Sequence, residues 1–428
     1  MKVIDSRDKN FRSILSSITG RGAVDTAGVE RAVKTILDGV KRRGDGAVAE
    51  YTKKFDGVDI KGAIEVNGKE IDRAFKDISR KDLALIELAA SRIESFHKKQ
   101  LRNSWFTVED NGSILGAKIT PLERAGIYVP GGKAAYPSTV LMNAIPAKVA
   151  GVDTVVMATP PGKDGINPYA LASARVAGVD RVFRAGGAQA IGALAFGTET
   201  IPKVDKITGP GNIYVATAKR LVFGTVGIDM VAGPSEILII NDGAGDPAWV
   251  AADLLSQAEH DELASSILIT TSKAMAARVC SELKSQLKDL KRRPIAAASI
   301  KKYGVIIIAQ DLKEAVKISN GIAPEHLELF VEKPFDLLGL VRNAGAVFLG
   351  KNTPEAAGDY LAGPNHTLPT GGTARFSSPL GVDDFIKKTS VIGFSTEAIA
   401  SLGGDIKRFA ELEGLEAHAK SVARRLKR

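Results

Sequence analysis

The sequence predicts an α/β protein made of two Rossmann-like units, each built on a parallel sheet, with small helical or loop-rich segments at both ends. Short apolar runs alternate with amphipathic helical segments from about residue 120 to 350. The tetrapeptide Ala-Gly-Val-Asp occurs at 150–153 and again at 177–180, each time between a predicted helix and a predicted strand. That interval is typical of successive strand–helix repeats in a parallel sheet. The length of 428 residues suffices for more than one domain.

The part of the chain before residue 120 is predicted to be helical and polar. Helices are expected over 30–42, 68–78 and 81–100, where apolar residues recur at helical spacing. Gly44-Asp45-Gly46 ends the first of them. These glycines also begin a match to G-x-G-x-x-G/A, at 44–49. Because the match follows a helix rather than a strand, we interpret it as a turn between helices and not as a dinucleotide fingerprint.

Two series of strands and helices follow. The first is predicted to contain the strands 152–159, 179–184 and 203–208 and the helices 167–176, 188–196 and 212–222. The second is predicted to contain the strands 236–241, 266–270, 305–309, 327–331 and 345–349 and the helices 246–261, 273–289, 311–319 and 335–342. After residue 350 the chain is rich in loops and closes with two short helices. We expect four parts: an N-terminal segment 1–25, a discontinuous first α/β unit 26–125 with 236–378, a second α/β unit 126–235, and a C-terminal segment 379–428.

The composition indicates a globular protein without a nucleic-acid or membrane partner. The net charge of +9 comes from 58 basic and 49 acidic residues that are interspersed along the chain, and such mixing does not make a nucleic-acid surface. Apolar runs stay well short of the ~20 residues that span a bilayer, and the N-terminus lacks an apolar signal-like stretch. Cys280 is the only cysteine. A single cysteine fits a reducing compartment, so we expect a cytoplasmic protein.

Histidine is scarce, and its distribution indicates one site. Four of the five histidines lie between residues 260 and 418, beside carboxylates or amides. Imidazole is the side chain best suited to metal binding and to proton transfer near neutral pH. The fifth, His97, is interpreted as part of a solvated helix face. The clustering therefore predicts that the chemistry lies in the second half of the chain.

The spacing of the histidines and of the neighbouring carboxyl and amide side chains is compatible with a metal or catalytic site but does not establish one. Gln257 and His260 are three residues apart on a predicted helix, which suits two metal ligands. A histidine favoured by the helix dipole explains that pair better on spacing alone. Glu325-His326 precede a strand and suit two proton carriers or an ordinary polar loop. Pro324 is expected to hold the residue before it in an extended conformation.

Longer segments of the chain resemble the histidinol dehydrogenase family, which carries out the last step of histidine biosynthesis. The matching segments are 42–45, 50–52, 55–56, 126–138, 209–215, 227–236, 253–261, 323–328, 358–366 and 413–418. The resemblance runs from end to end. It implies homodimers with intertwined terminal segments, so that 379–428 reaches the other subunit and His366 serves the other subunit's site.

The resemblance also implies cofactors and the residues that hold them. It implies one zinc ion per subunit, held by Gln257, His260, Asp359 and His418. The implied catalytic residues are Glu325 and His326. Contacts to the substrate, L-histidinol, are implied for Ser235, Gln257, His260, His326, Asp359, His366, Glu413 and His418. Contacts to NAD are implied for Tyr128, Gln189 and Asn212, which places coenzyme binding in 126–235 without the glycine fingerprint.

The implied reaction is the four-electron oxidation of L-histidinol, through L-histidinal, to L-histidine, with reduction of two NAD⁺. Zinc would orient the substrate through its imidazole and amine. His326 suits the base that removes the alcohol proton, and Glu325 suits the base that activates water for the aldehyde step. A zinc hydrolase of α/β fold uses the same groups for attack of water on an amide, and NADH formation distinguishes the two. A non-catalytic metal- or nucleotide-binding protein is disfavoured by the adjacent Glu325 and His326.

Overall fold

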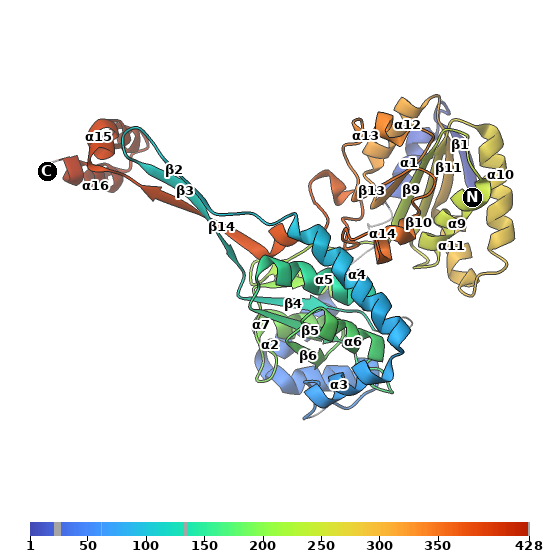
Figure 1. Ribbon diagram of the computed structural model, residues 1–428, viewed down its shortest axis with the longest axis horizontal. Helices are drawn as coiled ribbons and strands as arrows, with labels where there is room; N and C mark the ends of the chain where they lie inside the picture. The colour runs from blue at the N-terminus through green and yellow to red at the C-terminus, as the bar shows by residue number, and fades with distance from the viewer. Residues whose placement is uncertain (21–26, 61, 132–135, 427–428) are drawn as a thin grey trace.

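The computed structural model describes residues 1–20, 27–60, 62–131 and 136–426, and in these ranges the chain forms two α/β units and a projecting arm (Figure 1). Each α/β unit is built on its own parallel sheet, whereas the arm contains an antiparallel sheet. The predicted architecture of two parallel-sheet units is therefore confirmed.

The six-stranded unit has the strand order β1-β11-β10-β9-β12-β13, and all neighbouring strands are parallel. Side chains alternate between two apolar clusters, one on each face, so that Leu238 and Ile240 enter one cluster and Ile237 and Ile239 the other. The strands are β1 (Lys2–Asp5), β9 (Glu236–Asn241), β10 (Ser265–Thr270), β11 (Gly304–Ile308), β12 (His326–Phe330) and β13 (Ala346–Leu349). The helices are α1 (Phe11–Thr19), α9 (Pro247–Ala258), α10 (Lys273–Gln286), α11 (Arg293–Tyr303), α12 (Leu312–Ile322), α13 (Pro334–Leu338) and α14 (Glu355–Tyr360).

The five-stranded unit has the order β6-β5-β4-β7-β8, again with parallel neighbours. Its strands are β4 (Arg124–Tyr128), β5 (Thr154–Thr159), β6 (Arg181–Arg184), β7 (Lys206–Thr208) and β8 (Gly227–Ile228). One face is covered by α2 (Ala27–Asp56), α7 (Gly187–Phe196) and α8 (Ile213–Val222). The other face is covered by α3 (Gly68–Asp77), α4 (Arg80–Lys98), α5 (Pro137–Ala150) and α6 (Pro168–Val176).

The helices before residue 100 lie in a different unit from the expected one. The sequence-based division placed 26–125 with the six-stranded unit, but α2, α3 and α4 pack on the five-stranded unit. The contact is close: a Cβ added at Gly192 of α7 would lie 3.1 Å from Leu37 Cδ2 of α2. Conversely, β1 of the expected N-terminal segment pairs with β11. Helical periodicity shows which face of a helix is apolar but not which sheet covers it.

The turn predicted at Gly44 and Gly46 is present within the long helical stretch of α2. Gly44 has φ 49° and ψ −128°, which breaks the helix into two halves. The N–H of Asp45 donates to Glu199 Oε2 at 2.8 Å, so the break is tied to the loop after α7. The interpretation of this motif as a turn between helices is confirmed.

The arm projects far from both units and was not predicted (Figure 1). It consists of β2 (Trp105–Val108), β3 (Ile114–Pro121) and β14 (Ile386–Gly393), in the antiparallel order β14-β3-β2, followed by α15 (Thr396–Leu412) and α16 (Glu416–Leu426). Large apolar side chains are exposed along it, among them Trp105, Phe106, Phe409 and Leu412. Strands that pair across about 270 residues leave no local signal in the sequence.

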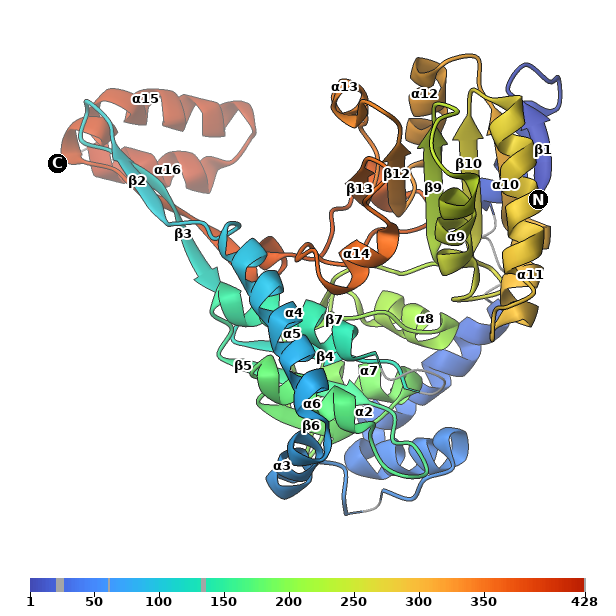
Figure 2. The same cartoon turned by 45° about the vertical axis from the view of Figure 1, so that its right-hand side comes forward.

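The two parallel sheets face each other edge to edge. β8 ends at Ile228 and β9 begins at Glu236, so residues 229–235 run from the carboxyl edge of one sheet to the amino edge of the other. The N–H of Gly233, on this crossing, donates to Thr370 Oγ1 at 2.6 Å. In Figure 2 the helix α8 lies between the two sheets. Groups at the carboxyl edge of the five-stranded sheet are thus presented to groups at the amino edge of the six-stranded sheet.

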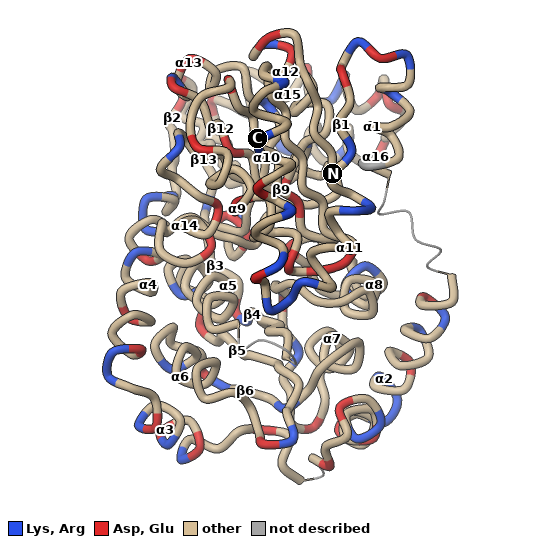
Figure 3. The backbone as a smooth tube through the Cα atoms, turned by 90° about the vertical axis from the view of Figure 1, so that its right-hand side faces the viewer, with Lys and Arg blue, Asp and Glu red and all other residues tan. Residues whose placement is uncertain are grey.

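Charged residues of both signs are mixed over the surface elements, including α2, α3 and α4 (Figure 3). Mixed charges of this kind are typical of solvated helix faces. Among the described residues, no helix combines the length and apolar character needed to cross a bilayer.

Candidate active site

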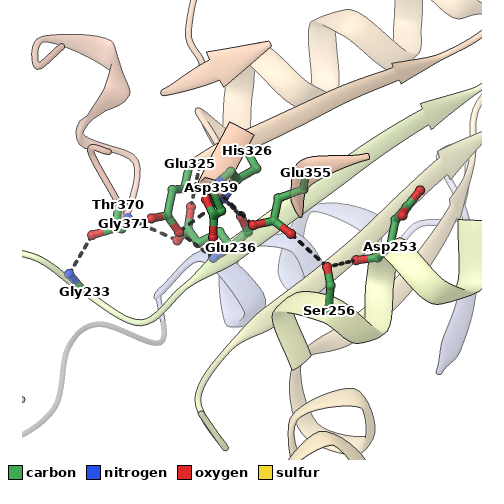
Figure 4. Close-up of polar contacts among 10 residues, drawn as sticks. All are labelled: Gly233, Glu236, Asp253, Ser256, Glu325, His326, Glu355, Asp359, Thr370 and Gly371. Atoms are coloured by element: carbon green, nitrogen blue, oxygen red, sulfur yellow. Dashed lines mark hydrogen bonds and ion pairs between the residues drawn. The ribbon is translucent and has the colours of Figure 1, made fainter. Parts of the chain in front are cut away.

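His326 is the first residue of β12 and is buried, with 3% of its surface exposed. Its Nδ1 lies 2.9 Å from the carbonyl oxygen of Glu236. Because a carbonyl only accepts, Nδ1 carries the proton and Nε2 carries the lone pair in the neutral ring. Nε2 is buried without a hydrogen-bond partner in the described chain. It faces Asp359 Oδ1 at 3.7 Å and Glu355 Oε1 at 3.8 Å, so it is oriented as a proton acceptor at an open position (Figure 4).

Burial disfavours the charged imidazolium of His326, but the carboxylates of Glu325, Asp359 and Glu355 outweigh it and raise the pKa of His326 to about 10. These acids together hold an excess of negative charge around one ring. A cation bound at Asp359 would offset that charge and return the ring toward the neutral form.

Glu325 is fixed by a reciprocal contact between the starts of two neighbouring strands. Its Oε2 accepts from the N–H of Glu236 at 2.8 Å, and its own N–H donates to Glu236 Oε2 at 3.3 Å. Burial raises the pKa of Glu325 to about 8, with the charge of His326 opposing the shift. A carboxyl with this pKa is suited to exchange protons near neutral pH.

The residue before Pro324 differs from the expected extended form. Ala323 has φ 55° and ψ 64°, the left-handed region, and is the C-cap of α12. Its N–H donates to Ser319 O at 2.8 Å, so the helix end sets its conformation and overrides the preference imposed by the proline. Left-handed conformations of non-glycine residues are strained and concentrate at functional sites.

A group of acids behind His326 was missed from the sequence. Ser256 of α9 donates to Glu355 Oε2 at 3.0 Å, and Glu328 Oε1 accepts from the N–H of Glu355 at 2.9 Å. Asp253 lies near enough to Glu328 for their charges to interact. Burial raises the pKa of Glu355 to about 8 and that of Asp253 to about 6, and it raises the pKa of Glu328 as well. The resulting network supports the ring of His326 from one side (Figure 4).

Part of this group of acids could have been predicted from the spacing of residues on strands and helices. Glu328 stands two residues after His326 on one strand, so both side chains lie on the same face. Asp253 and Gln257 are four residues apart on α9 and share a helix face. Glu355 has no such relation, because only the folded chain brings α14 beside β12.

Of the four implied zinc ligands, His260 lies near enough to Asp359 for their charges to interact, and Gln257 lies one turn before His260 at the end of α9. Gln257 is 1% exposed on α9, and its Oε1 is buried with no hydrogen-bond partner among the residues that the structure describes. His260 follows in the turn after that helix and feels the charge of Asp359, which lies on α14. Asp359 also forms a compact group with His326 and Glu355, whose nearest ligand atoms are within 4.8 Å of one another. An unpaired amide oxygen beside an imidazole and a carboxylate fits a bound divalent cation.

The charges around Asp359 explain its ionisation. Burial alone would raise the pKa of Asp359, but the imidazoles of His326 and His366 outweigh it and hold the pKa below the ordinary value. His366 thus lies near Asp359 of its own chain, whereas the resemblance implied that it serves the other subunit. Its loop is anchored on the five-stranded unit, where Asn365 Nδ2 donates to Met142 O at 2.5 Å.

His418 and Glu413 are not brought to this site by their own chain. Glu413 is the C-cap of α15 and His418 lies on α16, at the far end of the arm (Figure 1). The fourth implied zinc ligand is thus separate from Gln257, His260 and Asp359 within one chain. Ser235, by contrast, directly precedes Glu236 at the start of β9 and lies at the edge that carries the site.

The residues expected to contact a coenzyme lie at the carboxyl edge of the five-stranded sheet. Tyr128 ends β4, and its hydroxyl accepts from the N–H of Gly187 at 3.1 Å. Gln189, in the first turn of α7, is 1% exposed, and neither atom of its amide group has a hydrogen-bond partner in the ranges described. Asn212 caps α8 through bonds to Tyr214 N and Val215 N at 3.0 and 3.2 Å. The chain order reverses between β4 and β7, which is where α/β sheets bind ligands.

His97 departs from its expected exposure. It is completely buried on α4, and its Nδ1 lies 2.8 Å from Gln100 Oε1, which also accepts from the N–H of Val382. The interpretation as part of a solvated face is wrong, because the loop around Val382 covers this end of α4. The histidine has a structural position away from the site.

Comparisons with known proteins identify the family of the chain. A family model described as histidinol dehydrogenase matches residues 19–426. The chain is 59% identical to a histidinol dehydrogenase of Geobacter metallireducens, over 100% of this chain and 98% of the relative, and 57% identical to one of Syntrophotalea carbinolica, over 100% and 99%. The crystal structure of histidinol dehydrogenase from Elizabethkingia anophelis superposes with a TM-score of 0.94 at 40% identity, covering 100% of this chain and 98% of that one. The chain therefore belongs to the histidinol dehydrogenase family.

Proposed function

We propose that this chain oxidises L-histidinol through L-histidinal to L-histidine, with zinc and with reduction of two NAD⁺. The observation that carries this proposal is the position of His326 Nε2. It is a buried, unpartnered proton acceptor at the amino edge of one sheet, and that edge faces the carboxyl edge where Tyr128, Gln189 and Asn212 gather. A dehydrogenation needs a base and a hydride acceptor on either side of one carbon atom, and the facing edges offer these two positions.

The zinc site would be completed by a second subunit. We propose Gln257, His260 and Asp359 of one chain as ligands together with His418 of the partner subunit, and substrate contacts from Ser235, His366 and the partner's Glu413. When bound, the ion would orient the substrate through its imidazole and amine. The exposed apolar side chains of the arm support this proposal, because a homodimer in which the arm lies on the partner would cover them.

The chain's own residues divide the proton transfers. His326 Nε2 would remove the hydroxyl proton of histidinol, and NAD⁺, when held near Tyr128, Gln189 and Asn212, would supply the acceptor for the hydride of the carbinol carbon. Glu325 would then take a proton from the water that attacks the aldehyde. His326, once its first proton has passed to solvent, would take the hydroxyl proton of the hydrate, and a second NAD⁺ would supply the hydride acceptor. The Nδ1 contact to Glu236 O keeps the ring in one orientation through both steps.

The Glu325→Gln variant should impair aldehyde oxidation by about 10²-fold or more, the usual contribution of a general base, while alcohol oxidation changes much less. Glutamine keeps an oxygen that accepts from Glu236 N–H but cannot take a proton from water. Stopped-flow NADH formation from histidinol and, separately, from histidinal measures the two steps. Equal losses in both would remove Glu325 from its assigned role.

Removal of the metal by a chelator should abolish turnover, and zinc should restore it. The Gln257→Ala variant should retain less zinc after dialysis than the wild type, because a ligand with a buried oxygen is lost. Metal content by mass spectrometry gives a measurement that does not depend on activity. Fully active protein that contains no metal would contradict the ligand assignment.

A zinc hydrolase is the alternative, since a cation, a carboxyl and an imidazole also suit hydrolysis. NADH absorbance on addition of histidinol and NAD⁺ to the purified protein tests the proposal against it. An increase supports the dehydrogenase. No increase with zinc-loaded protein would refute it.

A further inference from the structure

An ion pair lies fully buried beneath the carboxyl edge of the five-stranded sheet. Lys219 of α8 and Asp229, the residue after β8, have side chains only 2% and 1% exposed, and Lys219 Nζ contacts Asp229 Oδ1. On the same helix, Val215, Ala218 and Val222 enter the apolar cluster on this face of the sheet. Two charges removed from water lose their hydration, and an apolar pair of similar volume is often as stable. Stability alone is therefore a weak explanation for the pair.

Both charged groups also hold the same residue, Gly209, by its main chain. The N–H of Gly209 donates to Asp229 Oδ2 at 2.8 Å, and Lys219 Nζ donates to the carbonyl oxygen of Gly209 at 2.8 Å. Asp229 Oδ1 additionally accepts from the N–H of Met230 at 2.6 Å. Hydrogen bonds to charged groups are stronger than those between neutral groups. The donor and the acceptor of one glycine are thus fixed together, an arrangement that we name the Gly209 clamp.

Gly209 begins the turn between β7 and α8, close to the proposed coenzyme contacts. Its φ is +113°, and a Cβ at this position would lie 2.1 Å from the carbonyl oxygen of Tyr128. Three residues later, Asn212 caps α8. The location of Asn212 relative to Tyr128 therefore depends on how this turn is held. The buried amide of Gln189, unpartnered within the described ranges, independently marks this edge as a place where a polar ligand is expected.

We propose that Lys219 and Asp229 are positioning residues of the coenzyme subsite, which act on a nicotinamide dinucleotide through the Gly209 clamp without touching it. The inference rests on the proposed function, because that function places NAD at this edge. Without the clamp the turn can relax, and Asn212 and the turn's main-chain amides lose their fixed distance from Tyr128. Misplacement by about 1 Å can cost up to ~10²-fold in an enzyme.

The test is the double variant Lys219→Met/Asp229→Leu. It removes both charges at once and leaves no unpaired buried charge, so the fold should be kept. The KM for NAD⁺ should rise about tenfold, which is less than the ~10²-fold that misplacement by about 1 Å can cost. The KM for histidinol and the zinc content should stay unchanged. A titration that follows NADH fluorescence should show the same weakening without turnover.

A matched control is available in the same unit. Lys148 pairs with Asp180 Oδ2 at 2.6 Å, and that oxygen also accepts from the N–H of Val155 at 2.7 Å. This pair lies at the amino ends of β5 and β6, at the opposite edge of the sheet. The variant Lys148→Met/Asp180→Leu should leave the KM for NAD⁺ within about twofold of the wild type.

A folded clamp variant with an unchanged KM for NAD⁺ would overturn the inference, and so would a parallel rise in the KM for both substrates. If the double variant does not fold, Asp229→Asn is measured by the same criterion, since it keeps an acceptor for Gly209 but loses the charge. The proposed function fails separately: wild-type protein that binds NADH but does not oxidise histidinol refutes the function and leaves the clamp testable by NADH binding. Wild-type protein that binds no NADH refutes both.

Discussion

The His326→Asn variant is expected to lose both oxidation steps, with kcat for histidinol and for histidinal each reduced by about 10³-fold, within the range for loss of a general base. The side-chain amide of asparagine can still donate to the carbonyl of Glu236, as Nδ1 does now. It has nothing at the position of Nε2, where the proton is accepted. Zinc content and thermal stability should change little, because the ring is not an assigned metal ligand.

The matched control for this variant is His97→Asn, which removes the other fully buried histidine of the described chain. It loses the contact to Gln100 and should lower the melting temperature without a comparable effect on kcat. Single-turnover NADH formation measures both variants. If His326→Asn oxidises histidinol at more than about a tenth of the wild-type rate, the proton acceptor is another group and the assignment fails.

Mixing two inactive variants should restore activity if the arm of one subunit completes the site of the other. His418→Asn removes a ligand at the end of the arm, and Asp359→Asn removes one beside His326. After unfolding and refolding together at equal amounts, half of the dimers should be mixed, each with one intact site. The mixture should then recover about a quarter of the wild-type activity, the share expected for random pairing in a symmetric dimer.

Each variant refolded alone is the control and should remain inactive. A mixture of His418→Asn with Glu325→Gln should also recover, because one site of each mixed dimer then has an unchanged Glu325 from one chain and an unchanged His418 from its partner. No recovery in either mixture, with dimers confirmed by size, would mean that the ligands come from one chain.

The sequence predicted much of the fold because most of the information was local. The strands of both parallel sheets are apolar runs such as 236–241 and 305–309, and strands of this kind are recognised without knowledge of their partners. The helix start at Asp246 and Pro247 was also predicted correctly, and Asp246 caps α9 through Ala248 N–H. The contacts between elements that are far apart in the sequence could not be predicted. These are α2 with α7, β1 with β11, and β14 with β3.

The residues of the candidate site likewise fall into those that the sequence indicated and those that only the folded chain brings together. Segments matched to the family indicated Glu325, His326 and Asp359, and the fold brings these three together. Glu355 escaped notice because its partners, Ser256 and His326, lie on two other elements. The nearness of His366 to Asp359 of the same chain was not expected, because sequence spacing does not show which loops meet in the fold.

The number of NADH molecules formed for each histidinol consumed tests the central proposal most directly. The site as described holds a base for the alcohol, a second base for water and one place for hydride acceptance, so the aldehyde should be oxidised before it leaves. The account predicts a ratio of two, with histidine as the only product. A ratio of one, with free histidinal, would contradict the role of Glu325, and a ratio of zero would contradict the dehydrogenase itself.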